Sequence, residues 1–344
     1  MIRYLLLLLV VGLLSSCGVY LEYPLQGNSQ QWKLITSHDS LVFRLHNTKY
    51  SIDSVINNAS QQILIACDSD VFKLPAKSLN PGLNDLSLSF YLSNGRKKVV
   101  NESLYMVSDV VPEKIKLDNY HLLKHDQQAF TQGLLWYNGF LYETTGLVGH
   151  ASVRVINPIT GELIKKKALD KEIFAEGIAM HNQQFAMLTW KDGLVYLFDD
   201  QLKQQAIVPF HQEGWGLTHD GKQYIASNGT NQLFFLSDQF KTDSTLQVYN
   251  NRGPVTYLNE LEFINGYVWA NVLGSDKLVV IDLESGKVEY EIDLSDCLDR
   301  NRYTDAGVLN GIAYDSINNT IFLTGKNWPY ILVWSALFFE KSNN

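Results

Sequence analysis

The sequence predicts an all-β protein, most of which is a five-bladed β-propeller. A short motif, a lead residue followed by a small or acidic residue and then Leu or Ile, recurs five times, with 44, 39, 44 and 51 residues between successive lead residues. Its copies are Gln132-Gly133-Leu134, Glu176-Gly177-Ile178, Trp215-Gly216-Leu217, Asn259-Glu260-Leu261 and Asn310-Gly311-Ile312. A period of roughly 40 to 50 residues built of short strands is typical of propeller blades. The 18 Tyr and 16 Phe residues agree with a β-rich fold, because aromatic side chains favour strands.

Residues 1–17 predict a lipoprotein signal peptide. Arg3 precedes an apolar run that is too short to span a membrane as a mature helix. Leu14-Ser15-Ser16-Cys17 then resembles a bacterial lipobox, in which the cysteine becomes the lipidated N-terminus. Acyl chains on Cys17 would anchor the protein to a membrane, since each buried methylene contributes about 0.8 kcal/mol. The alternative is a plain signal peptide with an incidental cysteine.

We therefore expect an exported bacterial lipoprotein of the cell envelope. Gly18 stands where an Asp commonly signals inner-membrane retention, which favours the outer membrane, facing the periplasm or the cell surface. The net charge of −8 provides no basic face and argues against nucleic acid as a partner. The other cysteines, Cys67 and Cys297, fall in different predicted domains. Two buried free thiols are thus favoured over a disulfide, although export would permit one.

A polar tether and a small β-sandwich are expected before the propeller. Residues 18–33 are polar and contain Gly18, Pro24 and Gly27, as a tether would. Over residues 34–112, apolar and polar residues alternate in short runs separated by turn sequences such as Asn94-Gly95. This pattern suits an immunoglobulin-like β-sandwich. No motif in it carries chemistry, so we expect a spacer or docking module.

The propeller is expected over residues 116–340, after a linker at Val110-Val111-Pro112-Glu113. Each repeat has room for four strands, but only 34 residues follow Asn310, which is room for three. The segment Asn119–Leu123, just before the first repeat, is the natural donor of the missing strand. Pairing the two chain ends in this way would remove the exposed edges of an open sheet.

The five lead residues are expected to meet at one end of a central channel, because the innermost strands of a propeller line it. They provide one carboxylate, Glu176, together with amides and an aromatic side chain. Trp190, Lys326 and Trp328 are placed to join the rim, and Glu260 and Glu262 are further carboxylates that face the same way. The sequence has no zinc-binding motif, nucleophile elbow or phosphate loop, so the metal content stays open.

Taken together, seven motifs resemble the plant- and bacterial-type glutaminyl-peptide cyclotransferases, also called glutamine cyclotransferases. They cover about residues 120–335 in order and are Phe130-Thr131-Gln132-Gly133-Leu134, Phe174-Ala175-Glu176-Gly177, Leu188-Thr189-Trp190, Gly214-Trp215-Gly216-Leu217, Leu258-Asn259-Glu260-Leu261-Glu262, Val308-Leu309-Asn310-Gly311-Ile312 and Thr324-Gly325-Lys326-Asn327-Trp328-Pro329. The resemblance implies a five-bladed propeller that converts the N-terminal glutamine of peptides or proteins to pyroglutamate and releases ammonia.

The resemblance also implies roles for single residues. Glu176 would be the catalytic proton shuttle, and the substrate would bind among Phe130, Gln132, Phe174, Trp190, Trp215, Asn259 and Lys326. Amide and ammonium donors of this set would hold the carbonyl oxygen as charge builds on it. The chemistry needs no cofactor, and the family allows a structural calcium ion in the channel, held largely by main-chain oxygens.

Alternatives remain at each position and for the whole protein. Glu176 could merely satisfy backbone amides, Trp190 and Trp215 could be blade packing, and Lys326 could be a solvated surface residue. Asn310 could line the channel without touching substrate. The rival functions are a non-catalytic surface propeller that binds a partner and a calcium-dependent propeller hydrolase of the lactonase kind. Two departures from the family pattern are Leu273, where a Trp is expected, and His125-Asp126, which lacks a preceding Pro.

Overall fold

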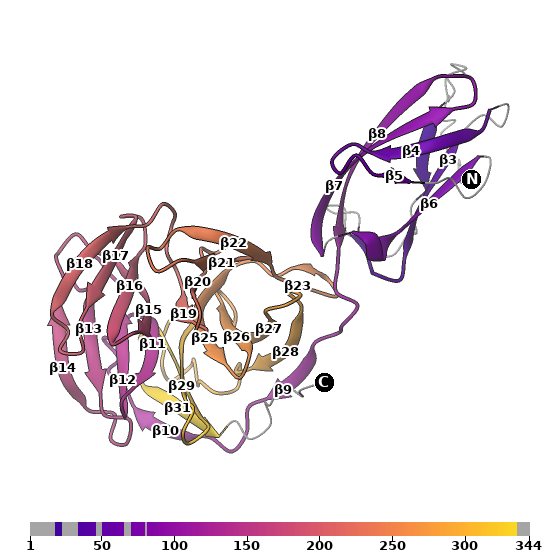
Figure 1. Ribbon diagram of the computed structural model, residues 1–344. Coiled ribbons are helices and arrows are strands. Elements are labelled where there is room, and N and C mark those ends of the chain that lie inside the picture. Colours follow the sequence, from indigo (N-terminus) through magenta and orange to yellow (C-terminus); the bar gives the residue numbers. More distant parts are fainter. Residues whose placement is uncertain (1–17, 23–33, 46–49, 65–69, 80, 336–344) are drawn as a thin grey trace, which may run out of the picture. The chain divides into compact units, whose positions relative to one another are not determined.

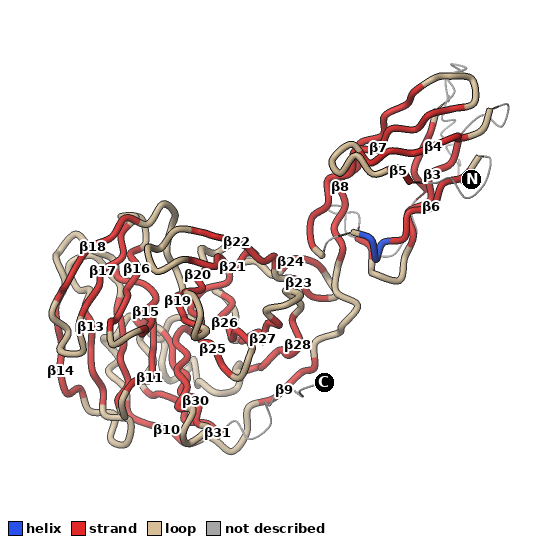
Figure 2. Tube along the Cα trace, viewed as in Figure 1, coloured by secondary structure: helices blue, strands red, loops and turns tan. Residues whose placement is uncertain are grey.

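The computed structural model describes residues 18–22, 34–45, 50–64, 70–79 and 81–335. Within these residues, regular structure consists of strands and a single 3₁₀ turn, η1 (Ala76–Ser78), which confirms the all-β prediction (Figure 2). The chain divides into two compact units between Met106 and Val107, a few residues before the predicted end of the first domain at 112. Residues 1–17 with Cys17, Cys67 and positions 336–340 of the predicted propeller lie outside the described residues.

The first unit contains two sheets (Figure 1). One has the order β1 (Val19–Glu22), β3 (Ser40–Leu45) and β6 (Val71–Pro75). The other has the order β2 (Leu34–Ile35), β8 (Lys97–Met106), β7 (Gly82–Leu92), β4 (Ile52–Asn57) and β5 (Ile63–Leu64). Alternate residues of β3 are buried, as its sequence pattern predicts. The Phe43 ring contacts Phe72 and Phe90 from the two sheets, with centroids 6.0 and 5.4 Å away, so both sheets share one core.

Two segments predicted to be irregular form strands instead. The predicted tether, residues 18–33, includes β1, which pairs antiparallel with β3 and packs Val19 against the core. At the start of the second unit, β9 (Glu113–Lys116) begins at the last residue of the predicted linker. It pairs in parallel with β28 (Val288–Asp293) of the same unit. Both pairings join segments that are distant in sequence, and no local pattern announces them.

Among the described residues, the second unit contains five sheets of four or five strands and a short hairpin, β23 (Tyr249–Asn250) and β24 (Gly253–Pro254). Sheet one contains β11 (Thr131–Tyr137), β12 (Phe140–Thr145), β13 (Ser152–Ile156) and β14 (Leu163–Ala168). Sheet two contains β15 (Ala175–His181), β16 (Gln184–Thr189), β17 (Leu194–Phe198) and β18 (Gln204–Pro209). Sheet three contains β19 (Leu217–His219), β20 (Tyr224–Ala226), β21 (Gln232–Leu236) and β22 (Thr242–Gln247).

Sheets four and five each include a strand from the segment that precedes sheet one. Sheet four contains β25 (Leu258–Ile264), β26 (Tyr267–Val272), β27 (Lys277–Asp282), β28 (Val288–Asp293) and β9. Sheet five contains β29 (Leu309–Asp315), β30 (Thr320–Gly325), β31 (Tyr330–Ser335) and β10 (His121–Lys124). The antiparallel pairing of β10 with β31 is the pairing predicted for the segment 119–123.

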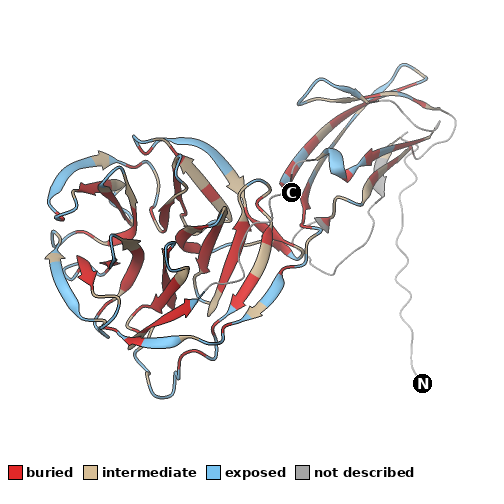
Figure 3. Cartoon of the chain, turned by 60° about the horizontal axis from the view of Figure 1, so that its bottom comes forward, coloured by how far each residue is buried: buried red, intermediate tan, exposed pale blue. Residues whose placement is uncertain are grey.

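The first strand of each sheet is largely buried, and the fourth strand is largely exposed except in sheet four, where β28 pairs with β9. Strand β11 is buried over most of its length, whereas β14 is almost wholly exposed, and sheet two repeats the contrast (Figure 3). The first strands lie side by side in the order β11, β15, β19, β25 and β29, and β29 also contacts β11. Apolar layers fill the space between neighbouring sheets, as where Tyr142 and Phe185 stack with centroids 4.4 Å apart.

The recurring motif coincides with an irregularity at the start of the first strands. In sheets one, two, four and five the register between the first two strands shifts at the lead residue, as in a β-bulge. Bulges re-aim side chains and are common beside functional sites. A Cβ added at Gly177 would collide with the backbone of Leu217, and one at Gly216 with that of Asn259. The small residue of the motif therefore reflects the close approach of neighbouring first strands.

Two buried carboxyl groups hydrogen-bond across the first strands. Glu260 stands where the other copies have Gly and accepts hydrogen bonds from the backbone N–H groups of Leu134 (3.2 Å) and Ile312 (2.8 Å). Glu262 accepts from the Tyr314 N–H (3.0 Å) and the Thr218 hydroxyl (3.3 Å). Burial raises the pKa of Glu260 well above its usual range and the pKa of Glu262 to about 8, against the opposing effect of these hydrogen bonds.

The variant Glu262→Gln should flatten the pH dependence of stability. The unfolded chain loses the Glu262 proton near the ordinary glutamate pKa, whereas the folded protein keeps it until about pH 8. Between about pH 5 and 8 the folded state binds more protons at Glu262, so this group lowers wild-type stability relative to the variant by roughly 1.4 kcal/mol per pH unit. The gap in Tm between variant and wild type should thus widen by about 3 °C per pH unit in thermal melts. A constant gap, as expected for the exposed control Glu172→Gln, would contradict the assignment.

Candidate active site

One pocket of the second unit brings together all eight residues that the sequence analysis assigned to the site. Its volume is about 230 Å³. Its lining residues are Phe130, Gln132, Phe174, Glu176, Trp190, Trp215, Asn259, Leu273 and Lys326. Four of the five lead residues thus converge on one pocket, and Leu273, where the family pattern has a Trp, forms part of the wall. Asn310, Trp328, Glu260 and Glu262 do not line the pocket.

The pocket lies where first strands begin and second strands end. Gln132, Glu176 and Asn259 occupy the irregular starts of β11, β15 and β25. Trp190 and Lys326 directly follow the second strands β16 and β30. Because first and second strands are antiparallel, these positions fall at the same end of the sheets. Residues nearly two hundred positions apart in sequence are thereby placed around one cavity.

Glu176 is held by a chain of amide hydrogen bonds. Its Oε1 atom accepts from Gln132 Nε2 at 2.9 Å, and its side chain is almost fully buried. The Oε1 atom of Gln132 in turn accepts from Asn310 Nδ2 at 3.2 Å, and the same nitrogen donates to the Thr131 carbonyl at 3.1 Å. Asn310 therefore fixes the orientation of the Gln132 amide, which directs its NH₂ group at the carboxylate.

Burial shifts the pKa values of the two ionisable groups of the pocket in opposite directions. It raises the pKa of Glu176 well above its usual range, while the charge of Lys326 and the Gln132 hydrogen bond oppose the shift and Glu213 adds to it. Burial also lowers the pKa of Lys326, against the attraction of Glu176. The Lys326 ammonium lies 4.8 Å from the centroid of the Phe130 ring, an attractive cation–π contact. A carboxyl group with a raised pKa is a stronger base than an ordinary carboxylate, which suits it to take up and release a proton.

The apolar wall is built from aromatic rings that support one another. Phe174 contacts Phe130 edge to face at 6.3 Å and Trp190 at 5.4 Å between centroids. Lys191 lies over the outer ring of this group, 4.0 Å from the Trp190 centroid. Gly229 packs so closely against the Trp215 ring that a side chain there would displace it. Packed rings of this kind present a fixed surface to a ligand.

Two buried polar atoms of the lining residues have no hydrogen-bond partner within the part of the chain that the structure describes. They are the Nε1 donor of Trp215 and the Oδ1 acceptor of Asn259. Buried polar groups are normally satisfied, so these two side chains are candidates to bond a ligand that enters the cavity their residues line. The pocket thus offers a donor, an acceptor, an ammonium and a carboxyl group around an aromatic wall.

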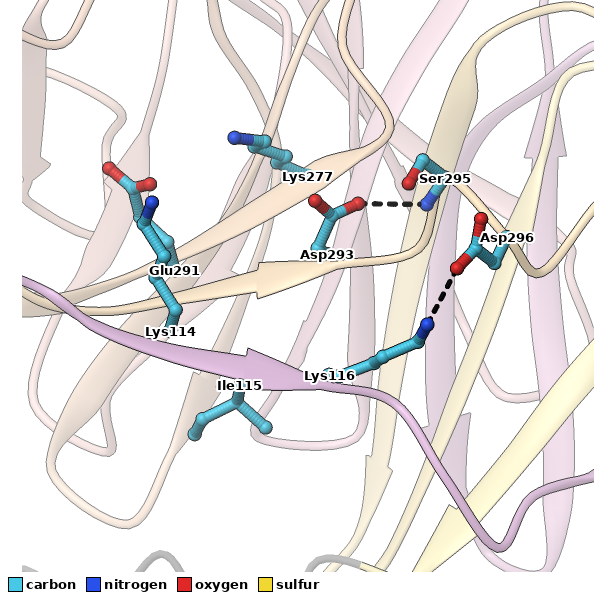
Figure 4. A pocket seen from close by; sticks show the side chains of 8 residues that line it. All are labelled: Lys114, Ile115, Lys116, Lys277, Glu291, Asp293, Ser295 and Asp296. Atoms are coloured by element: carbon cyan, nitrogen blue, oxygen red, sulfur yellow. Dashed lines mark hydrogen bonds and ion pairs between the residues drawn. The ribbon is translucent and has the colours of Figure 1, made fainter.

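A second hollow, on the outer strands of sheet four, has a different character (Figure 4). Lysines and carboxylates of β9, β27, β28 and the loop after β28 line this hollow. Lys116 Nζ lies 2.7 Å from Asp296, and the Ser295 N–H donates to Asp293 at 3.0 Å. Only some of its charged groups pair with one another, and unlike the first pocket it has no aromatic side chain among its lining residues.

Two kinds of feature, a side-chain metal cluster and a membrane-spanning helix, are absent from the described ranges. There, no group of three or more His, Cys, Asp or Glu side chains is arranged to hold a metal ion, and no helix is long and apolar enough to cross a membrane. Cys297 is buried with a free thiol, as expected. The sequence analysis missed Glu213, which influences Glu176 from the exposed position before Gly214-Trp215, and the hydrogen-bond role of Asn310.

Replacing Lys326 should raise the pKa of Glu176 further. In the variant Lys326→Met the positive charge that favours the carboxylate is gone, while the burial that disfavours it remains. A carbon-13 NMR titration of the Glu176 carboxyl group should show an upward shift. Lys191→Met removes an exposed ammonium over Trp190 and is the matched control, for which no shift is expected. An unchanged or lower pKa in Lys326→Met would contradict the coupling.

Comparison with known proteins agrees with the site. The profile of the glutamine cyclotransferase family matches residues 97–334. A curated glutaminyl-peptide cyclotransferase from Arabidopsis thaliana is 38% identical over 213 residues, which are 60% of this chain and 66% of the plant protein. The chain thus matches just under two thirds of the length of that relative.

A solved structure extends the comparison to the fold. The crystal structure of Myxococcus xanthus glutaminyl cyclase is 31% identical, with a TM-score of 0.59, and the match covers 64% of this chain and 97% of that one. The family match spans well over half of this chain and includes strands of all five sheets of the second unit. The chain therefore belongs to the glutamine cyclotransferase family.

Proposed function

We propose that this protein is a glutaminyl-peptide cyclotransferase, which converts the N-terminal glutamine of peptides or proteins to pyroglutamate and releases ammonia. The observation that carries the proposal is Glu176, a buried carboxyl group with a raised pKa, oriented by Gln132 at an aromatic pocket. Membership of the family and the name of the curated plant relative agree with it.

The reaction needs no nucleophilic side chain, because the substrate supplies its own nucleophile. The α-amine attacks the side-chain amide carbon, a C–N bond forms, and the bond from that carbon to the amide nitrogen breaks. The carboxylate of Glu176 takes the proton that the α-amine loses and returns it to the departing nitrogen, which leaves as ammonia. The enzyme ends in its starting protonation state. An α-amine has a pKa near 8, so a base with a raised pKa is suited to this transfer.

The other polar groups divide the remaining tasks. The Lys326 ammonium is the cation of the pocket and can stabilise the negative charge that builds on the amide oxygen. The Oδ1 acceptor of Asn259 suits a substrate N–H, and the Nε1 donor of Trp215 suits a substrate carbonyl. The Gln132 amide is already engaged with Glu176 and Asn310, so it orients the base instead of acting chiefly on the substrate oxygen. The aromatic wall would favour the folded, ring-forming conformation of the substrate.

We further propose that the second unit is a five-bladed β-propeller and that the first is an immunoglobulin-like sandwich. The five sheets, the succession of their first strands and the contact of β29 with β11 support the former. Two sheets around one core support the latter. The lipid anchor on Cys17 and the outer-membrane location remain proposals that rest on the sequence of residues 1–18.

A structural calcium ion is compatible with the channel but takes no part in the proposed chemistry. Calcium takes six to eight oxygen ligands. Asn310 Oδ1 is a buried oxygen without a partner in the described residues and could be one of them. Since no cluster of acidic side chains accompanies it there, main-chain carbonyls would have to supply most of the others. A calcium-dependent hydrolase, the rival enzyme, would by contrast lose activity at once on chelation.

The variant Glu176→Gln tests the proposal. Wild-type protein without residues 1–17 should release ammonia from a short peptide with N-terminal Gln, a mass loss seen by mass spectrometry. The variant should be slower by roughly 10²- to 10⁴-fold, the usual contribution of a positioned acid–base group. The exposed neighbour Glu213→Gln is the matched control and should retain most of the rate.

Three results would count against the proposal in different ways. Equal rates for Glu176→Gln and wild type would keep the reaction and remove the proton-transfer role from Glu176. Folded wild-type protein that converts none of several peptides would favour the binding-module alternative. Activity abolished by chelation alone would favour the hydrolase.

A further inference from the structure

A buried ionic cluster lies outside the pocket, and the proposed mechanism does not use it. It consists of His125, Glu143 and Arg154, each at most 4% exposed, and it reaches Asp126 near the surface. The His125 ring contacts Glu143 Oε1 through Nε2 at 3.0 Å, and Arg154 lies 3.8 Å from the other carboxylate oxygen. Arg154 also donates to Asp126 at 2.9 Å. Two cations thus face two anions, with the innermost pair excluded from water.

The contacts of His125 favour a positively charged ring when Glu143 is ionised. Its Nδ1 atom lies 3.0 Å from the carbonyl oxygen of Trp328, which can only accept a hydrogen bond. Its Nε2 atom lies at the same distance from Glu143, which accepts as well when ionised. A neutral imidazole has one N–H and could satisfy only one of these acceptors, whereas the imidazolium satisfies both.

The charges around the pair agree with this state. Burial alone disfavours a charged imidazole, but Glu143 and the Trp328 carbonyl outweigh it, so the pKa of His125 is raised, with Arg154 opposing. Burial also acts against ionisation of Glu143, but His125 and Arg154 hold its pKa below the usual value. The Asp126 carboxylate completes the set of charges that face the pair. The shifts of both partners therefore favour the ion pair over the neutral pair.

His125 connects two segments that carry site residues. One lies near the start of the second unit in sequence and the other near its end. Trp328, whose carbonyl it binds, is two residues after Lys326. Glu143 Oε1 also accepts from the Thr131 hydroxyl at 2.6 Å, and Thr131 directly precedes Gln132. Two further hydrogen bonds join the same segments, from the Asn327 N–H to the Ala129 carbonyl at 2.7 Å and from the Asn327 side chain to the Gln127 carbonyl at 2.9 Å.

We propose that His125 is a positioning residue of the reaction, whose charged ring, with Glu143 and Thr131, fixes Lys326 and Gln132 at their places around Glu176. This proposal rests on the proposed function. Stability alone is a weak explanation for this ion pair, since a buried ion pair is often no more stabilising than apolar residues of similar size. Its consequence is electrostatic: Lys326 and Gln132 both lower the pKa of Glu176, so their displacement should raise it.

The matched pair Thr131→Val and Thr131→Ser tests this directly. Val has nearly the shape of Thr but lacks the hydroxyl that bonds Glu143, whereas Ser keeps it. In Thr131→Val we expect kcat on N-terminal Gln peptides to fall about tenfold or more, with KM changed by less than about threefold. The acid limb of the pH–rate profile should move to higher pH, because the base becomes harder to ionise. Thr131→Ser should behave like wild type, and His125→Gln should repeat the loss.

A purely structural role predicts a different result. Thr131→Val and His125→Gln would then melt at lower temperature, yet the folded protein would keep the wild-type kcat and pH profile, which would overturn the proposal. If His125→Gln does not fold, the comparison of Thr131→Val with Thr131→Ser decides between the two roles, since of these two variants only Thr131→Val lacks the hydroxyl.

Two NMR measurements do not depend on turnover, so they separate this proposal from the proposed function. Nitrogen-15 shifts of His125 should show both ring nitrogens protonated at pH 7, and a carbon-13 titration should show a higher Glu176 pKa in Thr131→Val than in wild type. A neutral ring, or an unchanged Glu176 pKa, would overturn the positioning role. Wild-type protein that converts no peptide while both NMR results hold would instead refute the proposed function.

Discussion

The close approach of the five first strands is the constraint on which the rest of the second unit depends. At Gly177 and Gly216 the next strand leaves no room for a side chain, so the motif keeps its small second residue. At the equivalent position of sheet four, the motif has Glu260 instead of a glycine. Its carboxyl group accepts hydrogen bonds from the backbone of two other first strands, β11 and β29. The irregular register that accompanies this crowding in sheets one, two and four occurs at Gln132, Glu176 and Asn259, which line a common cavity.

The same crowding accounts for the electrostatics of the site. Glu176 is almost fully buried; among the described residues its carboxylate accepts a hydrogen bond from Gln132, and the charge of Lys326 favours its ionised form. Such a carboxyl group weakens the fold near neutral pH, because the folded protein must either hold the proton or bury the charge. Glu260 and Glu262 destabilise the fold in the same way, because burial also raises their pKa values. Of these three carboxyl groups, only Glu176 lines the pocket.

The sequence predicted the site more completely than the fold around it. The repeat identifies Gln132, Glu176 and Asn259 because each copy of the motif occupies the same place in its sheet. The period can be recognised in the sequence although the rest of each repeat differs. What it could not reveal is how these side chains are held. The amide of Gln132 depends on Asn310, and His125 depends on Trp328, partners roughly 200 residues away that no local pattern connects. Strands β1 and β9 were missed for the same reason, since each is defined by a distant partner.

The joining of β10 to β31 has a consequence for the time at which the pocket can exist. Gln132 belongs to the first repeat and Lys326 to the last, and the hydrogen bonds that bring their segments together run from residues 125–131 to residues 326–328. Contacts of such long sequence separation are slow to form, because closing a long loop costs conformational entropy before the contacts compensate for it. During synthesis the pocket cannot assemble until the last sheet has emerged, so a nascent or truncated chain would contain Glu176 without the neighbours that govern its proton.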